Sequence, residues 1–327
     1  MFYAQWGLKD RLMADPEVWL CYNCNDCSVH CPRDAKPGDV IKAVRSFAFE
    51  HFAFPGFLGK VLAEPAWFPL IFMVPVLLIG ALALIAASNS AEPLVWGWSG
   101  QVDFARFIPH GYIEMLFITG NILIFTFAAV GLFRFYRGMQ AAREVKMRMS
   151  FVKALWLTAL EILGNKRFGV CEIAKYRKLA HLLVLFGFIG TLSTTGLVFF
   201  LLIVFDVHSP FPMSHPVKWL GNASGLAIVV GMVIIIVQRV LNANVIGKAN
   251  YGQWLFIWTM FITAMTGLGA QFFRIAEIPN LAYPCYFVHL VAVFILLWYA
   301  PFSQFGHMFY RTLALVFTRS VDRTPPA

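Results

Sequence analysis

The chain has 327 residues, of which 59% are hydrophobic and only 13% are charged. Soluble domains are about 45–50% apolar and about a quarter charged, so an ordinary soluble enzyme, a disordered chain and a disulfide scaffold are excluded. The net charge of +9 does not predict a nucleic-acid partner, because basic residues collect on one side of a membrane in proteins that span it.

Apolar runs of about 20 residues without charge predict an all-α membrane protein, since each run can cross the hydrocarbon core as a helix. The sixth run exceeds the core, so we expect its C-terminal end to emerge into water or to bend near Pro301. The six predicted spans are Trp67–Ala91, Met115–Phe133, Leu179–Phe205, Trp219–Gln238, Trp254–Phe273 and Ile278–Tyr310.

Lys and Arg divide 23 to 3 between the two sides of these spans when the N-terminus is placed inside. The positive-inside rule then predicts a multi-pass protein of the inner (cytoplasmic) membrane with both termini in the cytoplasm. The inner connector, residues 136–178, contains the stretch SFVKALWLTALEIL (150–163), whose apolar residues have helical spacing. It predicts an amphipathic helix, either on the inner membrane face or against a partner protein.

Four cysteines lie within eleven residues, in the sequence CYNCNDCSVHCP (21–32). Cys21, Cys24, Cys27 and Cys31, followed by Pro32, have the ligand spacing of bacterial ferredoxins. A structural zinc site would use two separated pairs or a histidine, which this run does not supply in the usual pattern. The run therefore predicts a [4Fe–4S] cluster.

The cluster domain is expected over residues 1–62, and it contains a single cysteine run, which leaves open which cluster Cys31 binds. In two-cluster ferredoxins the fourth cysteine of each run binds the other cluster. Either Cys31 completes the same cluster, or its natural partner run is missing from this chain, which would make the domain half of a two-cluster domain. Residues 63–327 form the second predicted domain, a six-helix transmembrane cytochrome b bundle.

Three histidines fall at membrane depth, where ionisable groups are costly and tend to be functional. His289 and His307 lie 18 residues apart on the sixth predicted span. In an unbroken helix this spacing makes five full turns and a rise of about 27 Å, so both rings would leave one face near opposite membrane surfaces. That geometry suits two stacked haems.

His181 opens the third span on the inner side, where the sixth span ends, so His181 and His307 are predicted to bind one haem b from opposite sides. Otherwise, the three histidines would form hydrogen bonds within the bundle. A second haem would need a partner for His289, and His110 is the candidate at the outer mouth of the second span. The alternatives are a single haem, or a lone His289 near a quinone.

The sequence HLVAVFILLWYAPFSQFGH (His289–His307) resembles the last helix of the respiratory nitrate reductase gamma subunit, a dihaem cytochrome b. His181 matches the first ligand on that family's second helix. The family's other histidine on that helix aligns with Thr191, so a second haem could not be bound as it is in that family.

The whole chain resembles the Qmo C membrane proteins of the quinone-interacting membrane-bound oxidoreductase (Qmo) family, on the cysteine run, HFAFPGFLGK (51–60) and the six spans. That family fuses a heterodisulfide-reductase-C-like domain, usually with two cysteine runs, to a cytochrome b. The resemblance implies menaquinone or ubiquinone as substrate. It also implies soluble flavin and iron–sulfur partners resembling heterodisulfide reductase A (Qmo A and B), and a link to adenylylsulfate reductase in dissimilatory sulfur metabolism.

The expected function is therefore that of an electron-transfer subunit of a quinone-interacting oxidoreductase. It would pass electrons between quinone, haem b and the cluster, to or from soluble partners. The alternatives are a membrane cytochrome of a related sulfite-reductase-linked or heterodisulfide-reductase-like complex, and a mainly structural membrane anchor. No spacing assigns a quinone pocket.

Overall fold

The computed structural model describes residues 2–89, 100–142, 146–164, 175–207 and 209–321. Every regular element in these segments is a helix, which confirms the all-α prediction.

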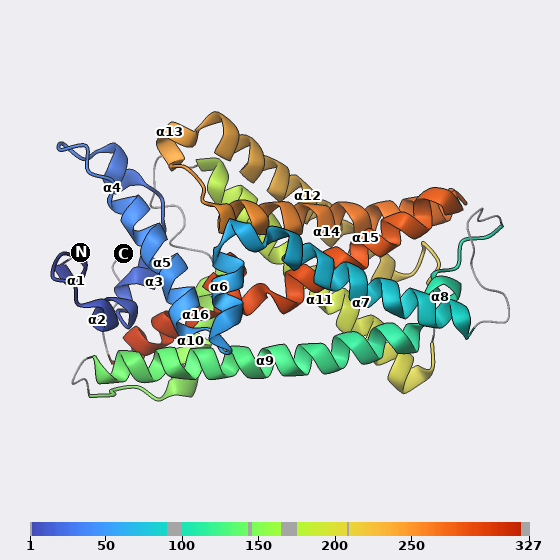
Figure 1. Cartoon of the computed structure of the whole chain (residues 1–327), viewed down its shortest axis with the longest axis horizontal. Coiled ribbons are helices and arrows are strands. Elements are labelled where there is room, and N and C mark those ends of the chain that lie inside the picture. Colours follow the sequence, from blue (N-terminus) through green and yellow to red (C-terminus); the bar gives the residue numbers. More distant parts are fainter. Residues whose placement is uncertain (1, 90–99, 143–145, 165–174, 208, 322–327) are drawn as a thin grey trace.

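Six helices are long and apolar enough to cross a membrane, which confirms the number of predicted spans within the described part of the chain. They run side by side along the long axis of the molecule (Figure 1). The chain is therefore a multi-pass membrane protein. The six are α7 (Phe68–Ser88), α9 (His110–Ala141), α11 (Lys175–Phe205), α12 (Pro216–Leu241), α14 (Tyr251–Ile275) and α15 (Pro279–Trp298).

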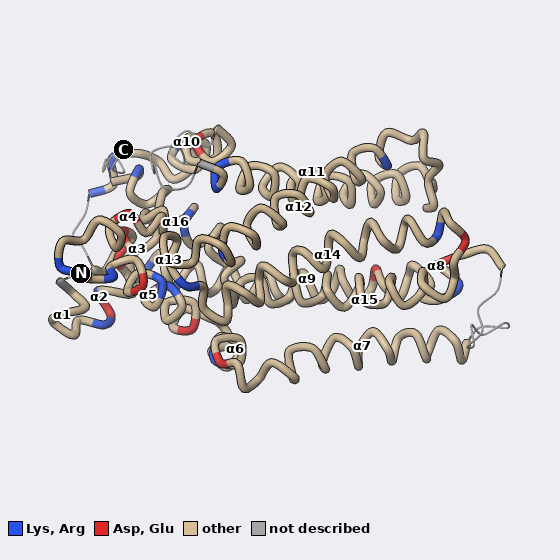
Figure 2. The backbone as a smooth tube through the Cα atoms, turned by 90° about the horizontal axis from the view of Figure 1, so that it is seen from above, with Lys and Arg blue, Asp and Glu red and all other residues tan. Residues whose placement is uncertain are grey.

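Shorter helices gather at the two ends of this bundle. One end, called here the basic end, carries the N-terminal helices and most of the Lys and Arg residues that the structure describes (Figure 2). The basic end contains α1 (Phe2–Gln5), α2 (Lys9–Met13), α3 (Glu17–Leu20), α4 (Asp26–Val29), α5 (Pro37–Phe52), α6 (Gly56–Ala63), α10 (Phe151–Gly164), α13 (Ala243–Ile246) and α16 (His307–Ser320). The opposite end carries α8 (Phe104–Phe107).

The last predicted span is not one continuous helix. Helix α15 ends at Trp298, two short 3₁₀ turns follow over Ala300–Phe302 and Gln304–Gly306, and α16 begins at His307. Pro301 lacks the amide hydrogen that would continue the helix, so the bend expected there is confirmed. The expectation that His289 and His307 leave one face of an unbroken helix is wrong, because eighteen regular helical steps do not connect them.

The N-terminal helices share one aromatic core with the bundle. Trp19 of α3 is 1% exposed, and its ring stacks on Tyr310 of α16 with a centroid distance of 5.0 Å. Phe49 of α5 and Phe135 of α9 meet the Trp19 ring edge-on at 5.1 and 6.1 Å. The N-terminal helices are therefore packed directly against α9 and α16.

Small residues allow α11 and α12 to approach each other closely. A side-chain carbon built on Gly187 would lie 2.8 Å from the Ser224 carbonyl oxygen, and one on Gly231 would lie 2.9 Å from the Ala180 carbonyl oxygen. Helix pairs in lipid associate mainly through such close backbone packing, because lipid is as apolar as the side chains themselves. This packing fixes the position of α11, which carries His181.

The predicted amphipathic helix within the connector is confirmed as α10. It packs against α16, with Ala154 and Thr158 fully buried, and Glu161 forms an ion pair with Arg319 at the end of α16. Trp156 on another face of α10 is 65% exposed. The buried face of the helix therefore packs on its own chain, and an apolar face remains open.

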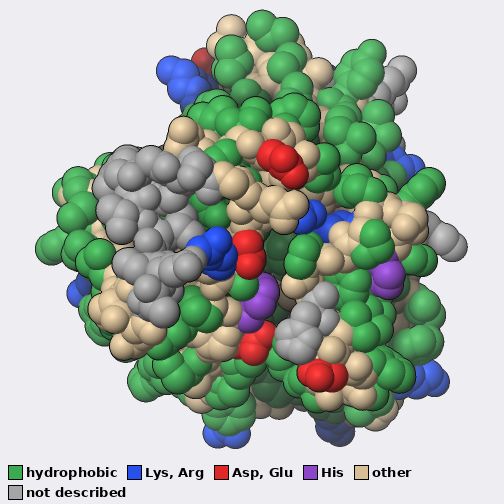
Figure 3. Space-filling view, turned by 90° about the vertical axis from the view of Figure 1, so that its right-hand side faces the viewer, with side chains coloured by type: hydrophobic (Ala, Val, Ile, Leu, Met, Phe, Trp, Pro, Cys, Tyr) green, Lys and Arg blue, Asp and Glu red, His purple; other side chains and the backbone are tan. Residues whose placement is uncertain are grey.

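The end of the bundle opposite the basic end has a different surface. Figure 3 views the molecule from that end and shows mostly hydrophobic side chains, with a few charged and histidine side chains around a central hollow. Three basic residues were predicted on this side, and two of them, Arg106 and Arg274, are in the last turns of α8 and α14. The contrast with the basic end agrees with the predicted charge asymmetry.

Candidate functional site

The cysteine run forms a loop around the short helix α4 at the basic end. Cys21, Cys24 and Cys31 are partly exposed and Cys27 is exposed, and all four are free thiols. Among the described His, Cys, Asp and Glu side chains, no group of three or more lies close enough to hold a metal ion. The assignment of these thiols as cluster ligands stays a prediction.

Two asparagines shape the loop between the first three cysteines. Asn23 and Asn25 have positive φ values of 54° and 74°, a left-handed conformation that asparagine tolerates better than most residues. The Asn23 amide donates to the Cys21 sulfur at 3.4 Å. The loop thus turns sharply between cysteines and directs a backbone N–H group at a sulfur atom.

A buried arginine, Arg45, and a partly buried one, Arg311, bind the backbone at the start of this loop. Arg45 of α5 donates from Nε to the Val18 carbonyl at 2.8 Å and from Nη2 to the Cys21 carbonyl. Arg311 of α16 donates to the carbonyls of Trp19 and Cys21 at 3.1 and 3.0 Å. Charge-assisted bonds of this kind fix a backbone more strongly than neutral ones.

A third arginine reaches the loop from the membrane bundle. Arg177, near the start of α11, donates to the carbonyls of Tyr22 and Asn23 at 2.8 and 2.9 Å. The Arg311 guanidinium also lies over the Tyr22 ring, 4.5 Å from its centre. The loop is therefore held by groups from three helices that are far apart in the sequence.

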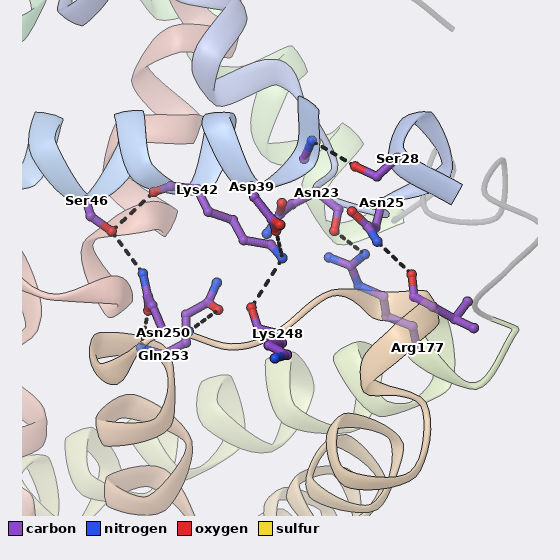
Figure 4. Close-up of polar contacts among 12 residues, drawn as sticks. Asn23, Asn25, Ser28, Asp39, Lys42, Ser46, Arg177, Lys248, Asn250 and Gln253 are labelled. Atoms are coloured by element: carbon purple, nitrogen blue, oxygen red, sulfur yellow. Dashed lines mark hydrogen bonds and ion pairs between the residues drawn. The ribbon is translucent and has the colours of Figure 1, made fainter. Parts of the chain in front are cut away.

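Polar contacts also join the loop region to the connection between α12 and α14 (Figure 4). Asn25 donates to the Val245 carbonyl at 2.7 Å, and Lys42 of α5 donates to the Lys248 carbonyl at 3.4 Å. Further along α5, the Ser46 hydroxyl accepts a bond of 3.1 Å from the Asn250 side chain. These contacts fix the cysteine loop and α5 against the membrane bundle.

The structure brings two predicted histidines, His181 and His307, near each other at the basic end. Burial lowers the pKa of His307 to about 4, and the charge of His181 contributes to the lowering. The Nδ1–H group of His307 donates to the Gln304 carbonyl at 2.6 Å. His307 is therefore neutral at physiological pH, with its Nε2 lone pair free of this bond.

His289 lies in the middle of α15 and its ring is held by α14. Its Nδ1–H group donates to the Thr263 carbonyl at 3.0 Å, and the Thr266 hydroxyl lies 3.3 Å from the same nitrogen. Gly267 leaves room for the ring, because a side-chain carbon built there would lie 2.9 Å from His289 Cε1. These bonds use Nδ1 and leave Nε2 for another partner.

His110 is the first residue of α9 and is exposed. The contacts of His289 are made with α14, whereas α9 joins the hydrophobic cluster that contains Leu290 and Phe294 of α15. The pairing of His110 with His289 stays a prediction.

Sequence reasoning missed the three arginines. Arg45, Arg177 and Arg311 stand in different parts of the chain, and each looks like one of many basic residues on the inner side. One signal was available: Arg177 precedes His181 by four residues, and Arg311 follows His307 by four. Residues with this spacing share a helix face.

The chain is similar in sequence to several known proteins. It is 24% identical over 319 residues to Citrate utilization protein B of Escherichia coli, covering 91% of this chain and 80% of that protein. It is 24% identical over 174 residues to one subunit of the dihydromethanophenazine:CoB–CoM heterodisulfide reductase from Methanosarcina thermophila, covering 50% of this chain and 65% of the relative.

A shorter match concerns a second reductase of the heterodisulfide type. The chain is 44% identical over 45 residues to one subunit of the H2:CoB–CoM heterodisulfide,ferredoxin reductase from Methanothermobacter marburgensis, which is 14% of this chain and 24% of the relative. No solved structure matches the chain.

The matches support a membrane oxidoreductase-like protein with an electron-transfer role, but they do not single out the Qmo membrane protein. The family description that matches, over residues 63–327, is Citrate utilization protein B. This range covers all six spans and α16. The chain belongs to the Citrate utilization protein B family.

Proposed function

We propose that this protein is the membrane subunit of a redox complex, carrying electrons between a quinone and a soluble partner. The observation that supports this most is the direct attachment of the cysteine loop to α11 and α16, the helices that bear His181 and His307. A four-cysteine loop and a histidine pair held by the same helices are the parts that two neighbouring redox centres need.

The donor sets fit these centres chemically. Cys21, Cys24, Cys27 and Cys31 would hold a [4Fe–4S] cluster, since all are free thiols on one loop and an amide N–H is directed at Cys21. When bound, such a cluster and a haem b each accept and release single electrons. The chain's task is then to hold the two centres together.

His181 and His307 would hold haem b. Metal-bound histidines usually donate their second ring N–H to a carbonyl or carboxylate, which fixes the ring orientation and leaves the other nitrogen for the metal. His307 has this arrangement with Gln304, and His289 has it with Thr263. His289 would serve a second haem, with His110 as its proposed partner, or would lie next to the quinone, menaquinone or ubiquinone.

The basic end would face the cytoplasm, in the inner membrane. The collection of Lys and Arg at that end supports this orientation through the positive-inside rule. Reporter fusions after residues 95 and 327 test it: a reporter that works only in the cytoplasm should be active only after residue 327. Activity only after residue 95 would contradict the orientation.

The relatives favour soluble partners of the heterodisulfide reductase type, because subunits of two such enzymes match this chain. The finer assignment, to Qmo A and B and adenylylsulfate reductase, is the version of this proposal implied by the sequence resemblance. The family match favours a second candidate, a soluble partner that acts on citrate or a related carboxylate. Purifying the tagged chain with its native partners, and identifying them, separates these candidates.

The central experiment measures iron and haem in the purified protein and in three histidine variants. His181→Ala and His307→Ala should each abolish the same haem signal in dithionite-reduced spectra, because each removes one side of a shared site. His289→Ala should spare that signal. Loss of different haems from the first two variants would refute the pairing, and a wild-type protein without haem bands would favour a structural membrane anchor.

A further inference from the structure

Two arginines lie one helical turn from the two histidines of the basic end. Arg177 precedes His181 on α11, and Arg311 follows His307 on α16. In an α-helix, residues four apart lie on the same face, about 6 Å apart along the axis. Each of the two helices therefore carries a ring and a guanidinium group on one face.

Both guanidinium groups bind the same short stretch of the cysteine loop. Each donates to two carbonyl oxygens within residues 19–23, at distances of 2.8 and 2.9 Å for Arg177 and 3.1 and 3.0 Å for Arg311. The loop is thus held from two sides. Movement of either helix relative to the loop would break two charge-assisted bonds at once.

Positive charge is concentrated around this stretch, because Arg45 reaches it as well. Arg45 of α5 donates to the Val18 carbonyl at 2.8 Å and to the Cys21 carbonyl. Cations beside a thiol favour the thiolate. For the same electrostatic reason they favour the negative charge that a metal centre on this loop would gain when it is reduced.

The chemistry of arginine suits this position better than that of lysine. A planar guanidinium presents several donors in a fixed fork, so one side chain can bind two neighbouring carbonyl groups. Arg311 also lies over the Tyr22 ring, where a cation is attracted by the face of the aromatic group. A lysine would keep the charge and lose the fork.

We propose that Arg177 and Arg311 are positioning residues that hold the cysteine loop against the two histidine-bearing helices and make its metal centre easier to reduce. This inference rests on the proposed function, since it assumes a cluster on the four cysteines. The two arginines place positive charge next to the cysteine loop, and they keep the loop at a fixed place relative to His181 and His307.

The test is a redox titration of the detergent-solubilised full chain, followed by EPR for the cluster and by absorbance for haem. Arg177→Gln and Arg311→Gln should shift the cluster midpoint to more negative potential, because a positive charge is removed. Arg177→Lys and Arg311→Lys should keep the midpoint closer to wild type but change the EPR line shape, because the fork is lost. Arg134→Gln is the matched control.

Arg134 is an arginine of α9 that donates to the Ala53 carbonyl at 3.2 Å, away from the cysteine loop. Its Gln variant should keep the wild-type midpoint. Loss of the cluster in the Gln variants but not in the Lys variants would also support the proposal, since charge at the loop is then required. A wild-type midpoint in both Gln variants, or equal effects in Arg134→Gln, would overturn it. A wild-type protein without a cluster EPR signal would instead overturn the proposed function.

Discussion

The surroundings of His181 and His307 at the basic end differ from those of His289 on α15. At the basic end, His181 and His307 come from separate helices and lie within each other's electrostatic influence. In the middle of α15, His289 is held from one side by the backbone of α14. The first environment has two histidines and the second has one.

This difference shows how distant segments can build a site in a membrane protein. Lipid offers no hydrophobic drive for helix association, so polar bonds and close packing must supply specificity. At the basic end, arginines and backbone carbonyls do this around the cysteine loop. Around His289 the specificity comes from close packing, because Gly267 has no side chain and leaves room for the ring.

The largest expected effect comes from Trp19→Ala, because this ring packs against α5, α9 and α16 together. Removal of a fully buried Trp side chain costs about 3–5 kcal/mol. We expect a lower melting temperature and loss of the iron of the proposed cluster. Thermal unfolding in detergent measures the first, and iron analysis measures the second.

Trp156→Ala is the control for this change, since the Trp156 ring is 65% exposed on α10. It should leave the iron content as in wild type. If Trp19→Ala also keeps its iron and its melting temperature, the shared aromatic core does not hold the cysteine loop. The basic end would then not depend on contacts between distant segments more than the surroundings of His289 do.

A smaller effect is expected from Gly267→Ala in the other region. The new side-chain carbon would lie 2.9 Å from His289 Cε1, so the ring must move, at a cost of about 1–3 kcal/mol. The absorbance of the second haem proposed at His289 should change, and that of the haem proposed at His181 and His307 should not. Gly196→Ala on α11 is the control, because nothing lies within 4 Å of its new carbon. Equal behaviour of both variants would mean that the His289 ring is not confined.

The sequence predicted the parts of this molecule that depend on local pattern. Apolar runs indicated the six spans, and the spacing in SFVKALWLTALEIL indicated α10. Within Ile278–Tyr310, Pro301 correctly indicated the bend, and α16 begins shortly after it, at His307. What failed was the expectation that an unbroken helix joins His289 to His307, because run length alone does not show where a helix ends.

Long-range contacts could not be predicted in the same way. Arg45, Arg177 and Arg311 converge on one loop only through the tertiary fold, and no local spacing connects three such distant positions. The packing of Trp19 on Tyr310 is of the same kind. The proposed ligands were chosen from the sequence, whereas the arginines beside them became visible only in the structure.

Asn250→Ala tests the polar contacts of the basic end with a still smaller effect. Asn250 caps α14, accepting from the Gln253 amide at 2.9 Å, and its side chain also donates to Ser46. Loss of such a cap costs about 1 kcal/mol, and the Ser46 contact is lost with it. We expect a modest fall in melting temperature. An unchanged melting temperature would mean that this end does not depend on its polar contacts.

Ser46→Ala separates the two contributions and should have the smallest effect. It keeps the cap of α14 and removes the bond between α5 and Asn250, worth about 0.5–1.5 kcal/mol. It also removes the bond from the Ser46 hydroxyl to the Lys42 carbonyl within α5. Ser88→Ala is the control, since the Ser88 hydroxyl bonds to the Ile85 carbonyl within its own helix, on an exposed surface. If Ser46→Ala lowers the melting temperature more than Ser88→Ala but less than Asn250→Ala, polar bonds between segments help to fix α5 on the bundle. If Ser46→Ala matches Ser88→Ala, aromatic packing alone holds that end, and the two regions differ less than their contacts indicate.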